Sequence, residues 1–167
     1  MNKTDILTLF EYNYWANARV LNAAANLTSD RFTAPAGLSH SSVRGALVHT
    51  LSAEYVWRLR CAVGVSPTML LDEQDFPAVE VLRGRWAEEE RKMRPYLNAL
   101  TDEALSQTVH YQTTTGMPYE NVCWHLLAHV VNHGTQFRAE AAVALTAYGQ
   151  SPGDLDLLRY FREKAAL

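Results

Sequence analysis

The sequence lacks the features that would place the protein in a membrane, outside the cell or on nucleic acid. Its first stretch, MNKTDILTLFEYNYW, has neither the apolar core nor the small-residue cleavage site of a signal peptide. No apolar run approaches the roughly 20 residues needed to span a bilayer. A net charge of −3 provides no basic excess for nucleic acid or acidic lipid. We therefore expect a cytoplasmic protein that binds neither nucleic acid nor membrane.

Motifs that carry chemistry are also scarce. Cys61 and Cys123 are too few and too far apart for a zinc motif or a disulfide framework, so we expect two reduced core residues. No serine or cysteine stands in a recognisable nucleophile context, no glycine-rich loop that cradles phosphate is present, and no pair of carboxylates stands out. Histidine is the side chain that remains as a candidate for chemistry.

Helical periodicity extends over most of the chain, whose 167 residues suit a single domain over 1–167 with a sizeable core. Apolar residues at helical spacing predict four long helices, over about residues 4–26, 42–63, 79–100 and 119–148. The long connections at 64–78 and 101–118 are the expected irregular parts, the second with a small β-ribbon or an ordered loop. The predicted fold is an all-α four-helix bundle with crossover connections and a short C-terminal helix.

Residues at the helix ends support these boundaries. Asn2 or Thr4 can cap the first helix, Ser41 or Ser42 can cap the second, and Gly64 is suited to end it. Asp154 is the expected cap of the C-terminal helix, and the proline at position 95 should kink the third helix or mark a boundary near its end.

Charged residues on the helices are expected to face solvent. Glu54 and Arg58 have the i, i+4 spacing of a helix-surface ion pair, and the run AEEERK at 87–92 suggests a solvated face. His40 and His110 fall in predicted loops, where we expect surface or loop-bracing roles instead of metal ligation.

A stripe of histidines marks the fourth helix. His125, His129 and His133 recur every four residues, which places them one turn apart along one side of the helix. His133 lies at the edge of the apolar face and is the best-placed metal ligand, whereas His125 lies furthest toward solvent. His49 lies on the second helix among small residues that leave space around its imidazole.

Four segments together resemble the DinB family, four-helix-bundle proteins often grouped with YfiT-like metal-dependent hydrolases and thiol transferases. The resemblance extends nearly end to end and rests on FEYNYWANARVL, SSVRGALVHTLSAEYVWRLR, LLAHVVNHGTQFRAEAAVAL and GQSPGDLDLLRYF. It implies a divalent metal held by one histidine of the second helix and two histidines spaced i, i+4 on the last long helix. It also implies a homodimer.

The resemblance assigns His49 and His133 as two of the metal ligands. The third position is Phe137, which cannot bind a metal. His129, one turn before His133, can replace it with the i, i+4 spacing of helical zinc sites, and Glu140 is a second candidate that can also hold a ligating water. Alternatively, Phe137 fills a vacant metal pocket and the histidines are hydrogen-bonded core residues.

Two functions follow from these alternatives. In the first, a bound zinc or nickel ion activates water or a thiol cosubstrate, which makes the protein a metal-dependent transferase or hydrolase acting on a small molecule. In the second, the protein is a non-catalytic dimeric bundle or small-molecule binder with a degenerate metal site. His49 and His133 favour the first function, and Phe137 favours the second.

Overall fold

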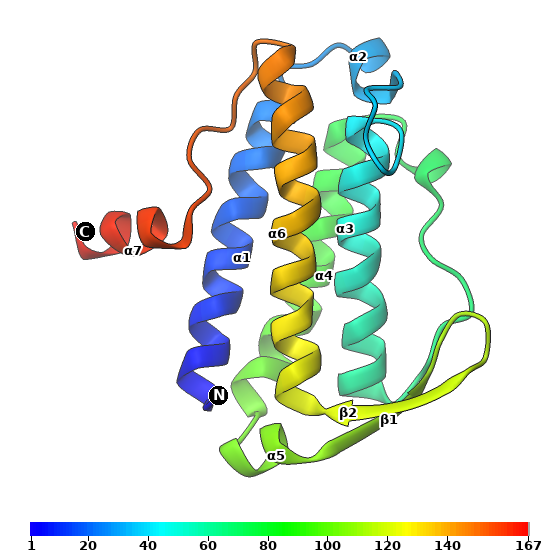
Figure 1. The fold of residues 1–167 in the computed structure, drawn as a ribbon, viewed down its shortest axis with the longest axis vertical. Coiled ribbons are helices and arrows are strands. Elements are labelled where there is room, and N and C mark those ends of the chain that lie inside the picture. Colours follow the sequence, from blue (N-terminus) through cyan, green and yellow to red (C-terminus); the bar gives the residue numbers. More distant parts are fainter. Residues whose placement is uncertain (167) are drawn as a thin grey trace.

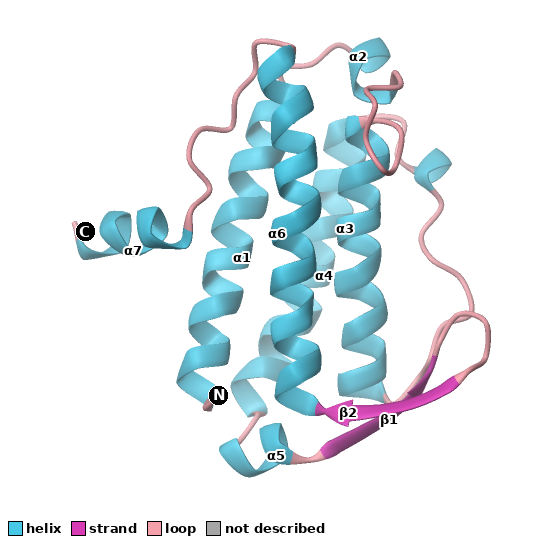
Figure 2. Cartoon of the chain, viewed as in Figure 1, coloured by secondary structure: helices cyan, strands magenta, loops and turns pink. Residues whose placement is uncertain are grey.

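The computed structural model describes residues 1–166 and confirms the predicted all-α bundle; Leu167, the end of the predicted domain, lies outside the described residues. Its four long helices are α1 (Lys3–Ala24), α3 (Val43–Arg58), α4 (Val79–Ala99) and α6 (Cys123–Ala147). Figure 1 shows them side by side, with α1 and α6 running in one direction and α3 and α4 in the other. The chain must therefore cross the length of the bundle between α3 and α4, which the connection at 64–78 does (Figure 2).

Local signals at the helix ends explain where the elements begin and stop. Asn2 caps α1 in a capping box with Asp5, and the Ser42 side chain accepts a hydrogen bond from the first turn of α3. After α3 the chain makes a π-helical turn, η1 (Leu59–Val63), and stops at Gly64, whose φ of 72° is left-handed. The predicted cap of the C-terminal helix was wrong, because Asp156 caps α7 (Leu157–Ala165) and Asp154 instead accepts from the Asp156 amide.

The predicted start of the fourth long helix also needs correction. Residues 119–122 belong to strand β2 (Pro118–Val122), which pairs antiparallel with β1 (Thr108–Gln112), and α6 begins only at Cys123. The register runs from the Thr108–Val122 pair to the Gln112–Pro118 pair. Backbone pairing with the preceding strand of this hairpin takes precedence over the helical pattern of the segment, whose tyrosine and valine suit a strand.

Short elements complete the chain. Two one-turn helices that the sequence did not predict, α2 (Ser29–Thr33) and α5 (Asp102–Ser106), cover opposite ends of the bundle, and the 3-10 turn η2 (Glu73–Asp75) lies in the long crossover (Figure 1). The third long helix continues through its internal proline to Ala99. None of the helices in residues 1–166 combines the length and apolar character needed to cross a bilayer.

The core consists of two buried apolar clusters, one around Leu47, Leu82 and Leu145 and the other around Phe10 and Leu127. Both clusters include residues of α1, α3 or α4 packed against α6, so burial of apolar surface holds the long helices together.

A buried polar network joins all four long helices. Glu54 of α3 accepts hydrogen bonds from the side-chain amides of Asn13 and Asn17 of α1, both at 2.8 Å, and from the indole of Trp86 of α4 at 3.1 Å. Arg138 of α6 is fully buried and donates to the amide oxygens of the same two asparagines. The predicted surface pair of Glu54 with the arginine one turn later is therefore wrong.

The arginine one turn after Glu54 is Arg58, and its partner is a different carboxylate. It forms an ion pair with Glu89 of α4, whose other carboxylate oxygen accepts from Arg85 at 3.2 Å. Glu89 is only 1% exposed, so the charged run at 87–92 is not wholly solvated as the sequence predicted. A carboxylate at this depth is tolerated because two guanidinium groups neutralise it.

Candidate metal centre

Two predicted ligands, His49 and His133, meet where α3 packs against α6. Their Nε2 atoms are 3.1 Å apart, and both side chains are half-buried. The pair comes from residues 84 positions apart in sequence, and the antiparallel packing of the two helices brings the imidazoles into contact, with their planes tilted by 44°. Two nitrogen atoms thus converge on one point between the helices.

Burial keeps both imidazoles neutral at physiological pH. It lowers the pKa of His49 to about 4, with a further contribution from His40. Burial also lowers the pKa of His133 to about 4, and His49, His129, His40 and Arg138 add to that shift. A neutral imidazole is the form that ligates metal ions.

Phe137 occupies the position next to this pair. It lies one helical turn after His133, is buried, and its ring centroid is 4.4 Å from that of His49 and 4.6 Å from that of His133. The aromatic ring therefore takes the space where an i, i+4 histidine would present a third imidazole.

His40 is the residue of this cluster that sequence reasoning missed. It lies in the loop before α3, and its ring stacks on that of His49 with centroids 3.8 Å apart and planes 19° apart. His40 lies in a loop as predicted, and the expectation that it is not a metal ligand stays a prediction. One signal was available in Gly45, because a Cβ atom at that position would lie 2.0 Å from the His40 carbonyl oxygen. Only glycine lets the loop approach α3 so closely.

The other candidates lie further out. His129 is exposed, and its ring centroid is 5.5 Å from that of His133 and 5.4 Å from that of Trp57. The Glu140 carboxylate accepts from the backbone amide of Ser39 at 3.0 Å and from its hydroxyl at 2.6 Å, so it braces the loop that carries His40. His125 is exposed, as its position on the helix predicted.

The two-histidine arrangement fits a metal ion in part. Two imidazole nitrogens bound at about 2.0–2.1 Å to one tetrahedral zinc would be about 3.4 Å apart, close to the observed 3.1 Å. Within residues 1–166, however, no group of three or more His, Cys, Asp or Glu side chains is arranged to hold an ion. The buried Nδ1 of His133 also lacks a hydrogen-bond partner, whereas a ligating histidine normally donates from its second nitrogen. Two imidazoles are fewer protein ligands than zinc sites normally supply.

Cavities open on both sides of His49. One of about 430 Å³ is lined by His40, His49 and the acidic residues Asp72 and Glu73. The other, of about 240 Å³, is lined by both His49 and His133. A small molecule can therefore reach the histidine pair from solvent.

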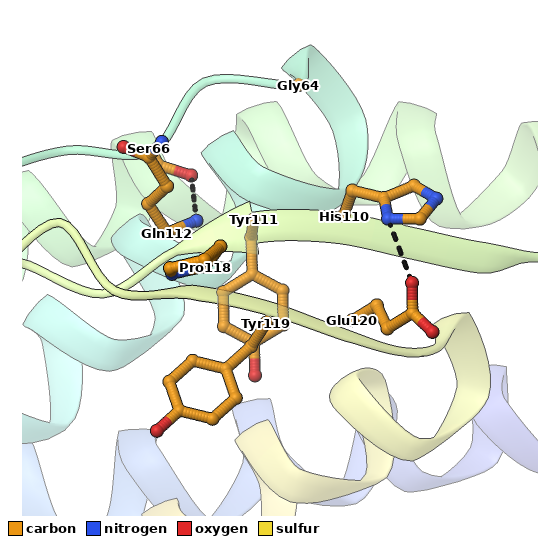
Figure 3. Close-up of a pocket in the computed structure, with 8 residues that line it drawn as sticks. All are labelled: Gly64, Ser66, His110, Tyr111, Gln112, Pro118, Tyr119 and Glu120. Carbon is orange, nitrogen blue, oxygen red and sulfur yellow. Dashed lines mark hydrogen bonds and ion pairs between the residues drawn. The ribbon is translucent and has the colours of Figure 1, made fainter.

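A larger hollow of about 670 Å³ lies over the β-ribbon (Figure 3), and neither His49 nor His133 lines it. It is lined by Gly64, Ser66, His110, Tyr111, Gln112, Pro118, Tyr119 and Glu120. Its titratable pair, His110 and Glu120, is 3.2 Å apart but mostly exposed, so water screens the interaction. His110 is the surface residue that the sequence predicted, and this hollow is a weaker candidate than the cavities beside His49.

The cysteines take no part in the cluster. Cys61 and Cys123 are free cysteines in this structure, the first partly buried and the second buried, and the expected reduced state stays a prediction. The expected homodimer and cytoplasmic location stay predictions.

Comparison with known proteins identifies the family to which this bundle belongs. The model of the DinB family matches residues 1–165. Protein DinB of Bacillus subtilis (strain 168) is 25% identical over 161 residues, an alignment that covers 89% of this chain and 90% of that protein. Because the family match covers almost the whole bundle, the chain belongs to the DinB family.

Proposed function

We propose that this protein binds a divalent ion, zinc or nickel, between α3 and α6 and uses it in a transferase or hydrolase reaction on a small molecule. The observation that carries the proposal is the 3.1 Å approach of the His49 and His133 Nε2 atoms beside two open cavities. A bound ion of this kind lowers the pKa of a coordinated water or thiol and so supplies a nucleophile near neutral pH.

The chain's own residues would hold and shield that ion. His49 and His133 donate the two imidazole nitrogens, and Phe137 excludes water from one side of the pair. His40 and His129 stand beside the pair and can each add a third imidazole after a side-chain movement. Incomplete ligation leaves positions for a substrate or a thiol cosubstrate, which is how catalytic sites differ from structural ones.

A metal analysis of protein purified without a histidine tag or added metal tests occupancy, and a calorimetric zinc titration of metal-free protein tests the ligands. We expect His49→Ala and His133→Ala each to abolish binding, because one remaining imidazole of the pair cannot hold the ion. His125→Ala is the matched control, since His125 is an exposed histidine of the same helix and should bind zinc like the parent. Parent-like binding by His133→Ala would place the ion elsewhere.

The nucleophile is tested separately with cobalt in place of zinc. Addition of 2-mercaptoethanol to the cobalt protein should produce an intense near-ultraviolet sulfur-to-cobalt absorption if a thiol occupies the open position. Its absence, with cobalt bound, would rule out the thiol-dependent reaction and leave hydrolysis.

A second function is favoured by the direct contact between the two histidines and by the phenyl ring packed on both. In that case the bundle is a non-catalytic binder in which Phe137 has replaced the metal ligand. A parent protein that binds neither zinc nor nickel in the titration above would select this alternative.

A further inference from the structure

Arg60 is a buried cation whose side chain lacks an anionic partner. It lies in the π-helical turn η1 and is 7% exposed. Its guanidinium packs over the rings of Trp57 and Tyr111, at 4.5 and 5.1 Å from their centroids, and Nη2 donates to the Gln112 carbonyl at 2.8 Å. Its Nε is buried and has no hydrogen-bond partner among the described residues.

Three other arginines that pack on aromatic rings, Arg19, Arg85 and Arg94, each form an ion pair with glutamate. Arg31 and Arg138 pack on tyrosine rings without an ion pair among the described residues, and Arg138 is instead satisfied by the amide oxygens of Asn13 and Asn17. No carboxylate in residues 1–166 lies within ion-pair distance of Arg60. Burial accordingly lowers the pKa of Arg60. The side chains that oppose this shift are Tyr111 and Cys61, and neither is a carboxylate. A buried guanidinium without a carboxylate is uncommon, because its lost hydration is normally replaced by an anion.

Arg60 and the histidine pair line the same cavity. Arg60, Trp57 and Thr114 line the same 240 Å³ space as His49 and His133. The planar fork of arginine donors matches the oxygen atoms of carboxylate and phosphate groups. The cavity on the other side of His49 is lined by Asp72 and by Glu73, which forms an ion pair with Arg44 at 3.7 Å, so an anionic group is better placed beside Arg60.

We propose that this cavity binds the carboxylate or phosphate group of a small anionic ligand through Arg60 and directs the rest of the ligand toward His49 and His133. The identification of that ligand as the substrate rests on the proposed function, whereas anion binding itself does not. The space beside Arg60 is smaller than a typical ligand pocket of roughly 300–1,000 Å³, so it suits one charged group of a longer molecule.

Inorganic phosphate and acetate are the two probes, added separately to metal-free protein. The side-chain Nε–Hε resonance of Arg60 should shift and saturate with one or both anions, and the anion that binds more tightly identifies the source of the negative charge. Because no metal is present, a failure of anion binding is distinguishable from a failure of zinc binding at the histidines. Lack of any saturable shift with both anions in the millimolar range would overturn the proposal.

Variants then assign the effect to this side chain. Arg60→Met should weaken binding of the preferred anion by at least about tenfold, as expected for loss of a charge-assisted, forked contact. Arg94→Met is the matched control, because Arg94 also stacks on a tyrosine ring but lines neither cavity. If Arg60→Met does not fold, Arg60→Lys retains the charge without the fork and should still weaken binding. Parent-like anion affinity in the folded Arg60 variant would also overturn the proposal.

Discussion

Replacement of Phe137 by histidine should convert the two-imidazole pair into a three-imidazole site. The phenyl ring lies 4.4 Å from the His49 ring and 4.6 Å from the His133 ring, so an imidazole there can reach an ion held by the other two. We expect zinc affinity to rise by at least about tenfold, which corresponds to about 1.4 kcal/mol. Without metal the variant should lose about 1–3 kcal/mol of stability, because a polar ring replaces a buried apolar one.

The assay combines calorimetric zinc titration with thermal denaturation in the absence and presence of zinc. Zinc at about a hundred times its dissociation constant should raise the free energy of unfolding of Phe137→His by about 2.7 kcal/mol, which offsets most of the stability lost without metal. Phe137→Leu is the control, because it removes the ring without adding a ligand. If Phe137→His binds zinc no more tightly than the parent and the leucine variant, the ion does not lie beside this position and the histidine stripe is structural.

The buried polar network yields two further predictions, each measured by urea denaturation. Gly134→Ala should destabilise the protein by about 1–3 kcal/mol, because the new Cβ would lie 2.6 Å from Nη1 of the buried Arg138. This overpacking outweighs the gain of about 1 kcal/mol in helix propensity. An alanine variant more stable than the parent would contradict the prediction. Glu54→Gln should lower the free energy of unfolding by about 2–4 kcal/mol. Its new amide NH2 group must face a donor, either the Trp86 indole or the side-chain amides of Asn13 and Asn17. The buried guanidinium of Arg138 also loses a nearby negative charge. Parent-like stability of that variant would mean that the carboxylate is protonated in the folded protein.

Helix boundaries could be predicted where local chemistry determines them. Asn2, Ser42 and Gly64 act through hydrogen bonds or backbone angles within a few residues, and each has the predicted role. The meeting of His49 and His133 was also accessible, because the family resemblance identifies the ligand positions and helix packing brings them together.

Features that depend on distant partners were not accessible in this way. Glu89 lies in a run of charges that suggests a solvated face, and only the approach of Arg58 from another helix explains its burial. The position of His40 depends on a loop whose path is set by the left-handed residue Ser41 and by its contact with Gly45. A hydrophobic pattern carries no information about such pairings, because it records the preferred environment of each residue and not the identity of its neighbour.

The cavity that Arg60 and the histidine pair line connects the proposed metal site with the proposed anion site. Inside the bundle, Glu54 and Arg138 are satisfied by side chains from neighbouring helices, which fixes how those helices align. Arg60 and His133, which line the 240 Å³ cavity, each have a buried polar atom without a partner among the described residues, as do Tyr14, Arg19 and Arg44 away from that cavity. An ion at the imidazole pair and an anionic group at Arg60 would neutralise each other's field, so the binding of either should strengthen the binding of the other.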